Sequence, residues 1–238
     1  MLIINNLSKS YSKGKIKALN DVSAKLSNGI YALLGPNGAG KSTLMNILTL
    51  GLKQDSGTVL WNDSSIEAAG RDYRSILGYM PQQQGLYDGF RGLDFLYYMA
   101  GLKDIPTKET KDEVNRVAEA VNLSDRVLDR LSGYSGGMKQ RILLATAIMG
   151  DPKIVILDEP TAGLDPKERI RVREIVRKMA GDKIIIFATH VVSDIETIAD
   201  EVILLKKGVI ADRGSVDDLN EKFEVEDLES VYMKVFGE

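Results

Sequence analysis

The hydrophobic pattern divides the chain into a strand-rich beginning, a helical middle and an alternating end. Apolar and polar residues alternate within 2–4 and within 22–26, which predicts two strands separated by polar residues and followed by a turn. The apolar run 30–34 predicts a short buried strand that leads directly into a glycine-rich loop. Apolar periodicity then predicts a helix over 41–50, with Gly51 as the residue that ends it.

After another predicted strand over 56–61, the pattern is mainly helical from about 85 to about 150. In this middle part, apolar residues recur three and four positions apart, as at 114, 117, 118 and 121. From residue 153 onward, β-branched runs alternate with helical patterns, which favours a parallel sheet covered by helices. The expected elements are a strand over 154–157, a helix over 166–180, a strand over 184–188, a helix over 191–199 and a strand over 201–205.

Composition places these elements in an ordinary globular protein. The 238 residues are 44% hydrophobic and 27% charged, and the absence of cysteine excludes a disulfide scaffold and fits a cytosolic setting. The net charge of −3 provides no basic field, so we expect no nucleic-acid partner. The beginning of the chain lacks the features of a signal peptide, and no apolar run approaches the roughly 18 residues of a membrane span. We therefore expect another polypeptide to supply any membrane path.

The glycine-rich loop has a phosphate-binding pattern, Gly-x-x-x-x-Gly-Lys-Ser. The backbone N–H groups of such a loop point at phosphate oxygens, which requires glycine where a Cβ would clash or φ is positive. The helix that follows adds the partial positive charge of its N-terminus. Lys41 can reach the β- and γ-phosphates, and the Ser42 hydroxyl can bind Mg²⁺. The expected nucleotide-binding residues of the loop are Gly35, Pro36, Asn37, Gly38, Ala39, Gly40, Lys41, Ser42 and Thr43.

Two adjacent carboxylates, Asp158 and Glu159, follow the predicted strand 154–157. The carboxyl ends of strands are where α/β sheets bind ligands. We expect Asp158 to hold Mg²⁺, directly or through water, and Glu159 to activate the attacking water as a general base. Two solvated acids at a strand end are the plain alternative, but the phosphate loop upstream favours the catalytic interpretation.

The sequence Tyr134-Ser135-Gly136-Gly137-Met138 precedes the carboxylates, and a serine, two glycines and a helix N-terminus can form a second anion site. Taken together, these motifs resemble the nucleotide-binding domain of ATP-binding cassette (ABC) transporters over nearly the whole chain. The usual family signature is Leu-Ser-Gly-Gly-Gln, so the first and fifth positions differ here. This variant is more similar to bacterial export-type (ABC-2-like) ATPase subunits than to nutrient importers.

The resemblance implies one domain over 1–238 with the α/β fold of a P-loop NTPase. It implies a RecA-like core with an N-terminal antiparallel β-subdomain, together over about 1–82 and 150–215, and an inserted helical subdomain over about 83–149. A C-terminal tail helix is expected over about 216–238. An apolar stripe in that tail favours packing on the core, through Leu228, Val231, Tyr232 and Val235.

The resemblance also implies roles for residues that composition and spacing leave unassigned. His190, the only histidine, would contact the γ-phosphate and hold Glu159 and the water in line. Gln82 would contact Mg²⁺ or the water and join the core to the helical subdomain, although Gln83 and Gln84 leave its register open. Tyr11 would stack on adenine, a contact that tolerates any base.

Two further elements of the family act across a dimer interface. Ser135, Gly136 and Gly137 would bind the ATP of a second subunit in trans. Asp165 would cross the interface, and it also has the sequence context of an Asp-Pro helix start. The chain would then form a head-to-tail dimer, either with itself or with a paralogous ATPase subunit.

The resemblance therefore implies the ATP-binding and ATP-hydrolysing motor subunit of an ABC transporter, with export as the expected direction and ATP and Mg²⁺ as cofactors. Its partner would be an integral membrane subunit that docks near Gln82 and residues 83–100. The protein would be cytoplasmic and peripheral on the inner face of the cell membrane.

Two other classes of function compete with this interpretation. Soluble ABC-type ATPases act on DNA or the ribosome, but they typically carry long coiled coils or two cassettes, which this chain lacks. A P-loop kinase or GTPase would leave the Ser-Gly-Gly motif unexplained, and no Asn-Lys-x-Asp guanine motif occurs.

Overall fold

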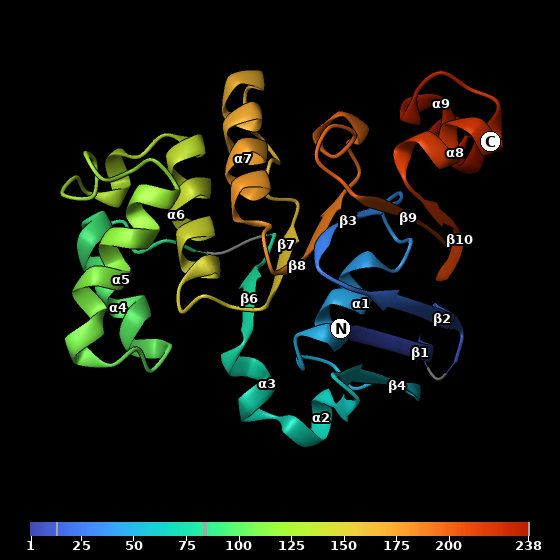
Figure 1. Ribbon diagram of the computed structural model, residues 1–238, viewed down its shortest axis with the longest axis horizontal. Helices are drawn as coiled ribbons and strands as arrows, with labels where there is room; N and C mark the ends of the chain where they lie inside the picture. The colour runs from blue at the N-terminus through green and yellow to red at the C-terminus, as the bar shows by residue number, and fades with distance from the viewer. Residues whose placement is uncertain (13, 83–84, 238) are drawn as a thin grey trace.

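The computed structural model describes residues 1–12, 14–82 and 85–237. It contains two β-sheets, a block of helices formed by the middle of the chain, and a pair of short helices at the C-terminus (Figure 1). No helix in these three ranges is long and apolar enough to cross a membrane.

The first sheet is antiparallel, with strand order β2-β1-β4-β5. Leu2 and Ile4 of β1 alternate into a core beneath the sheet, and Leu7 reaches the same core after an irregularity between Ile4 and Leu7 shifts the register; all three are buried. The strands are β1 (Leu2–Tyr11), β2 (Ile16–Leu26), β4 (Ser56–Trp61) and β5 (Ser64–Ser65).

The second sheet has six strands in the order β10-β9-β3-β8-β7-β6. Every pair in it is parallel except β10 with β9, so the expected parallel sheet carries one antiparallel edge strand. The inner strands are continuous apolar runs because both faces of the sheet are covered. The strands are β3 (Gly29–Leu34), β6 (Leu77–Met80), β7 (Ile154–Asp158), β8 (Ile184–Thr189), β9 (Glu201–Lys206) and β10 (Val209–Gly214).

The register of this sheet brings the sequence motifs to one edge. Leu34 of β3 pairs with Thr189 of β8, and Asp158 of β7 pairs with Ala188 of β8. Because the three strands are parallel, the phosphate loop after β3, Glu159 after β7 and His190 after β8 leave the sheet side by side.

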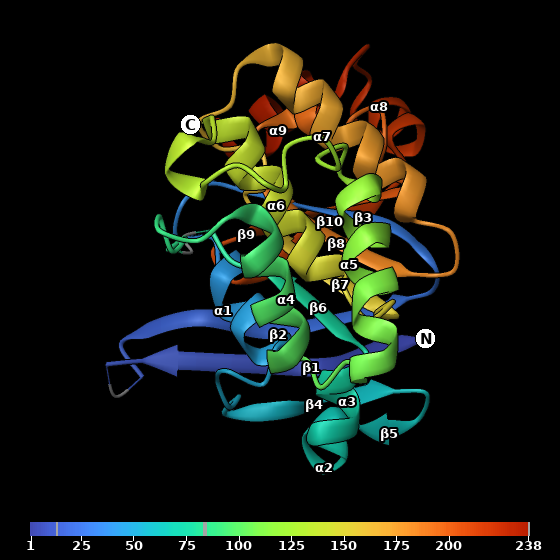
Figure 2. The same cartoon turned by 90° about the vertical axis from the view of Figure 1, so that its left-hand side faces the viewer.

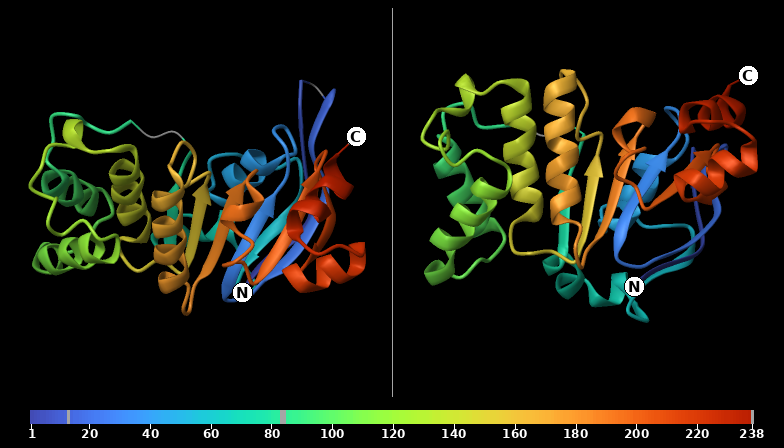
Figure 3. Two further views of the ribbon diagram at one scale, coloured as in Figure 1. Left: turned by 90° about the horizontal axis from the view of Figure 1, so that it is seen from above. Right: turned by 45° about the horizontal axis from the view of Figure 1, so that its top comes forward.

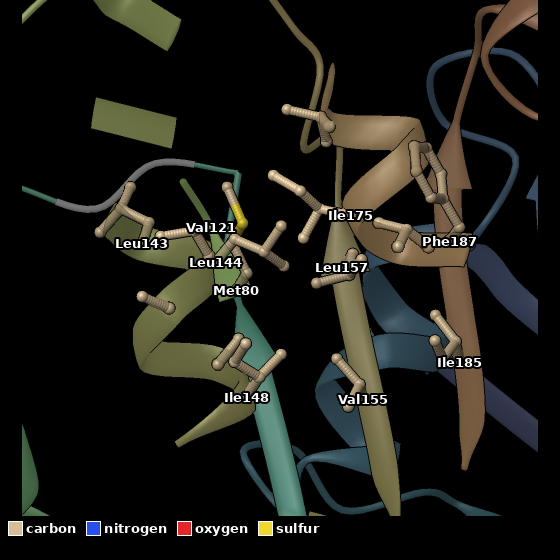
Figure 4. Close-up of a cluster of buried hydrophobic side chains, with 14 of the residues drawn as sticks. Met80, Val121, Leu143, Leu144, Ile148, Val155, Leu157, Ile175, Ile185 and Phe187 are labelled. Carbon is tan, nitrogen blue, oxygen red and sulfur yellow. The ribbon is translucent and has the colours of Figure 1, made fainter. Parts of the chain in front are cut away.

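The helical block consists of α4 (Gly92–Leu102), α5 (Thr107–Ala120) and α6 (Gly136–Ile148), which lie in front of the second sheet in Figure 2. A single turn, η1 (Leu131–Gly133), precedes α6. Helix α6 is buried on nearly all sides, which is typical of a helix that packs against several elements. Its Leu144 and Ile148 face Met80 of β6, and Leu157 of β7 closes the same cluster (Figure 4).

Two predicted helices are shorter than expected. The helix over 41–50 is α1 (Lys41–Leu48), and Leu50 rather than Gly51 takes the left-handed conformation that ends it, at φ +59. The predicted helix over 191–199 was wrong, because only a 3₁₀ turn, η2 (Val192–Asp194), forms there and is followed by turns. Side-chain hydrogen bonds at both ends of η2 replace the regular helical pattern. The Thr189 hydroxyl accepts from the Val191 N–H before η2, and the Asp194 carboxylate accepts from the Thr161 hydroxyl at its end.

Other helical predictions were confirmed. The helix over 166–180 is α7 (Pro166–Met179), and it lies between the helical block and the loop that follows β8 (Figure 1). The short helices α2 (Ile66–Ala69) and α3 (Arg71–Ser75), which were not predicted from the sequence, connect the first sheet to β6.

The C-terminal tail forms two helices rather than one. Helix α8 (Val216–Phe223) ends at Glu224, whose left-handed φ of 53° breaks the helix, and α9 (Leu228–Phe236) starts anew with Asp227 as its N-cap. Leu228 and Val231 are buried, so the predicted packing of the tail on the core was confirmed. Figure 3 shows this pair at the end of the molecule opposite the helical block.

A half-buried lysine joins two helices of the block. Lys103, directly after α4, donates through Nζ to the Met149 carbonyl at the end of α6, over 2.9 Å. Burial lowers the pKa of Lys103 to about 8, and the nearby Glu113 carboxylate offsets only part of that effect.

Lys103→Met should therefore change how stability varies with pH. The pKa of Lys103 is near 10.5 in the unfolded chain and about 8 in the folded protein. Between these values the unfolded chain binds more protons, so Lys103 makes the free energy of unfolding rise with pH. In urea titrations, the free energy of unfolding of the native protein, relative to that of the variant, should increase by on the order of 1 kcal/mol between about pH 7.5 and about pH 9.5. The exposed Lys108→Met is the control, and a pH-independent difference for Lys103→Met would contradict the argument.

Candidate functional site

The phosphate loop connects β3 to α1 and is held tightly against neighbouring strands. Gly40 has φ +111, and a Cβ on it would lie 2.4 Å from the Ala18 carbonyl oxygen of β2. Gly38 has φ +81 with open space around it, so conformation rather than contact requires glycine there. Both kinds of constraint predicted from the sequence are therefore present.

A cavity of about 270 Å³ lies over this loop. The hydroxyl of Tyr11 from β1 is 3.4 Å from Oγ1 of Thr43, and Tyr11 is 40% exposed, so part of the residue is accessible to a ligand. Three residues of β2 that the sequence did not single out also contribute. The lining consists of Tyr11, Ile16, Lys17, Ala18, Pro36, Asn37, Gly38, Gly40, Lys41, Ser42, Thr43, Gln82, Asp158 and Glu159.

Lys41 is a buried cation in the middle of the cavity. Its side chain donates to the carbonyls of Gly35 and Pro36. Burial lowers the pKa of Lys41, and the carboxylates Glu159 and Asp158 counteract that effect. An anion delivered to the loop would satisfy this charge in a place that water reaches poorly, which is the electrostatic condition for phosphate binding.

Asp158 ends β7 and is the second charged group of the cavity. Its pKa is raised to about 6, because the side chain is buried and lies near Glu159, while Lys41 opposes the shift. At neutral pH the carboxylate is therefore mostly ionised and available to a cation.

Glu159 is held in a conformation that the sequence does not reveal. Its φ is +50, which is strained for a residue with a side chain. Its backbone N–H donates to the Ala188 carbonyl over 2.9 Å, so the neighbouring strand β8 fixes the turn. The buried carboxylate contacts the last residue of β8 and the residue after it. Thr189 Oγ1 donates to Oε2 over 3.2 Å, and His190 Nδ1 is 2.8 Å from Oε1.

This contact assigns a proton to one ring nitrogen of the histidine. An ionised carboxylate can only accept, so His190 donates to Glu159 through Nδ1, and Nε2 is the ring nitrogen not used in this contact. The predicted pairing of His190 with Glu159 is thus present. Thr189 was missed as a partner of Glu159, although it stands directly before His190.

The residues expected to hold Mg²⁺ form a donor set that suits this ion. Ser42, Gln82 and Asp158 supply a hydroxyl, an amide and a carboxylate, and all three line the same cavity. Oxygen ligands are the ones Mg²⁺ prefers, usually few from the protein and completed by phosphates and water. Among the described residues there is no cluster of three or more His, Cys, Asp or Glu that would hold a metal ion by itself. The alternatives Gln83 and Gln84 lie outside the described residues.

The signature residues lie on a different surface. Ser135 is the N-cap of α6 and accepts from the Met138 N–H over 3.2 Å, so the predicted helix N-terminus is present. Gly137 allows close packing, because a Cβ there would lie 2.4 Å from Oε2 of Glu168 in α7. Tyr134, where the family usually has leucine, is buried and donates its hydroxyl to the Arg126 carbonyl.

A separate groove of about 750 Å³ runs past these residues. Its lining includes Gly136, Gln82 and Leu164, so it joins the signature, the segment after β6 and the loop before α7. Asp165, which follows that loop, caps α7 by accepting from the Glu168 N–H over 3.0 Å. In the described residues, Gln82 lines both cavities, whereas Ser135, Gly137 and Asp165 line neither.

Comparisons with known proteins agree with this arrangement. Residues 19–162 match the family model described as ABC transporter. An uncharacterized ABC transporter ATP-binding protein, YxlF of Bacillus subtilis, is 35% identical over 224 residues, which are 93% of this chain and 73% of that protein. The ABC transporter ATP-binding protein NatA of Bacillus subtilis is 28% identical over 98% of this chain and 97% of its own length. The ABC transporter A family member 8 of Dictyostelium discoideum is 35% identical over 93% of this chain, which spans only 27% of that protein.

Solved structures share the fold. A structure described as the ATP binding subunit of an ABC transporter has a TM-score of 0.85 and 25% identity, and the likeness covers 99% of both chains. A dimeric post-hydrolysis ATP-binding cassette bound to ADP and Pi has a TM-score of 0.79 and 24% identity, over 90% of this chain and 98% of that one. The fold class predicted from the sequence is thereby confirmed.

Proposed function

Because this chain belongs to the ABC transporter family, as one of its ATP-binding and ATP-hydrolysing cassettes, we propose that it is the motor subunit of an exporter. The observation that carries the proposal is the separation of its two anion-binding elements. The phosphate loop, Asp158 and Glu159 line one cavity, whereas the signature serine caps a helix on another surface. A second copy, or a paralogous subunit placed head to tail, would bring its signature against the nucleotide of the first.

In this function each residue of the cavity has a separate role in ATP hydrolysis. Lys41 and the loop backbone bind the β- and γ-phosphates, and Tyr11 packs on the base. Glu159 accepts a proton from the attacking water as its oxygen bonds to the γ-phosphorus, and the bond from that phosphorus to the bridging oxygen of ADP breaks. When bound through Ser42, Gln82 and Asp158, Mg²⁺ would supply neutralisation of phosphate charge.

His190 contributes orientation in this scheme. Its Nδ1 bond to Glu159 holds the carboxylate, and Thr189 holds the other carboxylate oxygen. The base therefore has its rotamer set before substrate arrives, which is how positioned acid–base groups gain efficiency. Nε2 is the nitrogen with which His190 would approach the γ-phosphate, and it would donate to a phosphate oxygen when it also carries a proton.

An aromatic cluster after the Gln82 segment is the proposed docking surface for the membrane subunit. Tyr87 is 53% exposed and Tyr98 is 42% exposed, and their rings contact edge to face with centroids 5.8 Å apart. Phe90 packs against both. Exposed, mutually packed aromatic rings are typical of interface anchors. Docking there would place the protein at the cytoplasmic face of the cell membrane.

Affinity purification of the tagged chain from detergent-extracted membranes of its own cells tests this proposal. A polypeptide with several membrane-spanning segments should co-purify, and a double change Tyr87→Ala and Tyr98→Ala should reduce its recovery at least about fivefold by loss of anchor residues. Tyr97→Ala is the matched control, since Tyr97 is also exposed on α4 but lies outside the ring cluster. Recovery with ribosomes or DNA and without a membrane protein would contradict the transporter assignment.

A further inference from the structure

We propose that Asp194 is a positioning residue that holds the His190 segment in register with the turn carrying Glu159 and with α7. The proposal deepens the ATPase function and rests on it. Its basis is a hydrogen-bonded cluster formed by Asp194, Thr161 and Arg169, which three different elements bring together.

Asp194 is a carboxylate with almost no access to solvent. It is 1% exposed, as is Thr161, whose Oγ1 donates to Oδ2 over 2.6 Å. Arg169 of α7 donates through Nη2 to the same oxygen over 3.0 Å. Burial of a carboxylate is costly unless it is paired and hydrogen-bonded, and the bonds from Thr161 and Arg169 offset this cost for Asp194.

The cluster links the same two segments of the chain as the pair Glu159 and His190. Thr161 comes two residues after Glu159, and Asp194 comes four residues after His190. Beyond the bonds that Glu159 makes to Ala188 and Thr189 of β8, the two turns are joined by Glu159 with His190 over 2.8 Å and by Thr161 with Asp194 over 2.6 Å. The first contact changes when His190 engages a phosphate, whereas the second contains no group that touches substrate. The second contact can therefore preserve the alignment of the two turns through the reaction.

The same segment is also tied to α7. Arg173 of α7 donates to the Ser193 carbonyl, next to Asp194, and Arg169 binds Asp194 itself. The N-cap of α7 is Asp165, the residue expected at the interface with the second subunit. Movement of that helix start on dimer closure would therefore be transmitted to His190 through Asp194, rather than being absorbed in the loop between them.

Thr161→Val tests the inference because it removes the hydroxyl and keeps the shape of the side chain. His190 is the only histidine in the sequence, so the imidazole proton and nitrogen NMR signals can be assigned to it without ambiguity. Without nucleotide, Thr161→Val should shift these signals, and Thr161→Ser should restore them. In ATPase assays, kcat should fall about tenfold for Thr161→Val while KM for ATP stays within about twofold, as expected for lost orientation rather than lost binding.

Thr146→Val is the matched control. Thr146 is 3% exposed, and its hydroxyl donates to the Leu143 carbonyl within α6, away from the site. It should lower the melting temperature without affecting the His190 signals or kcat. Asp194→Asn, which keeps an acceptor oxygen but removes the charge facing Arg169, is a second variant that should shift the His190 signals if Thr161→Val fails to fold.

The outcomes separate this inference from the proposed function. If Thr161→Val loses stability but leaves the His190 signals and kcat unchanged, as in the control, Asp194 has only a structural role and the inference is overturned. If the native protein itself lacks ATPase activity, the proposed function fails, while the NMR comparison without nucleotide still decides whether the cluster sets the environment of His190.

Discussion

Glu159→Gln should lower ATP turnover by about 10²–10⁴-fold, the usual contribution of a positioned general base. The amide keeps the volume of the carboxylate and can still bond to His190 and Thr189, so the turn should keep its geometry. It cannot accept the proton of the attacking water. ATP affinity should stay near the native value, because the phosphate loop and Lys41 are untouched.

Steady-state hydrolysis and equilibrium binding of a fluorescent ATP analogue measure the two halves of this prediction. The variant should also accumulate as an ATP-bound dimer in size-exclusion chromatography, because ATP still closes the dimer but is not hydrolysed, and hydrolysis is the step that reopens it. Glu119→Gln is the control for the substitution, since Glu119 is exposed on α5 far along the chain from the site. Hydrolysis by Glu159→Gln at the native rate would remove Glu159 from the role of base.

The parts of the site that the sequence predicted are those encoded locally. A glycine-rich loop between an apolar run and a helical pattern requires only its own residues, and the strain that demands glycine at Gly38 and Gly40 arises from the loop and its contact with β2. The carboxylates at the end of β7 are likewise a local signal, because an apolar run followed by two acids marks the carboxyl end of a buried strand.

The parts that could not be predicted depend on register between distant strands. Thr189 meets Glu159 only because β7 and β8 pair with Asp158 beside Ala188. The positive φ of Glu159 depends on the same pairing, through the bond to the Ala188 carbonyl. The hydrophobic pattern predicts neither contact, because both strands are apolar up to their last residue and the pattern does not fix how they pair.

Long-range contacts also explain the incorrect helix predictions. The 191–199 segment has helical spacing, but Asp194 is drawn to Thr161 and Arg169, so the chain adopts turns there. In the tail, the apolar stripe of α9 was recognised correctly, whereas the break at Glu224 was not, because a left-handed glutamate has no sequence signal comparable to glycine.

Ser135→Asp should abolish hydrolysis while leaving ATP binding by the isolated chain intact. Aspartate is as good an N-cap as serine, so α6 should retain the bond from the Met138 N–H. Its negative charge would face the phosphates of the nucleotide held by the second subunit, and like-charge repulsion should prevent ATP-dependent closure, with turnover falling at least about 100-fold. Ser132→Asp is the matched control, since Ser132 is exposed three residues earlier.

Mixing this variant with Lys41→Ala decides whether each site is built from two chains. Lys41→Ala alone should lose ATP affinity by about tenfold or more, because a buried cation next to the phosphates disappears. In a mixed dimer, one composite site contains both changes and the other contains neither. If that one intact site turns over, an equimolar mixture should recover roughly a quarter of native activity, since about half of the dimers are mixed and each has one of two sites intact. If Ser135→Asp instead weakens ATP binding by the isolated chain as much as Lys41→Ala does, the signature acts within its own chain. The separation of the two anion-binding elements would then no longer support a head-to-tail dimer.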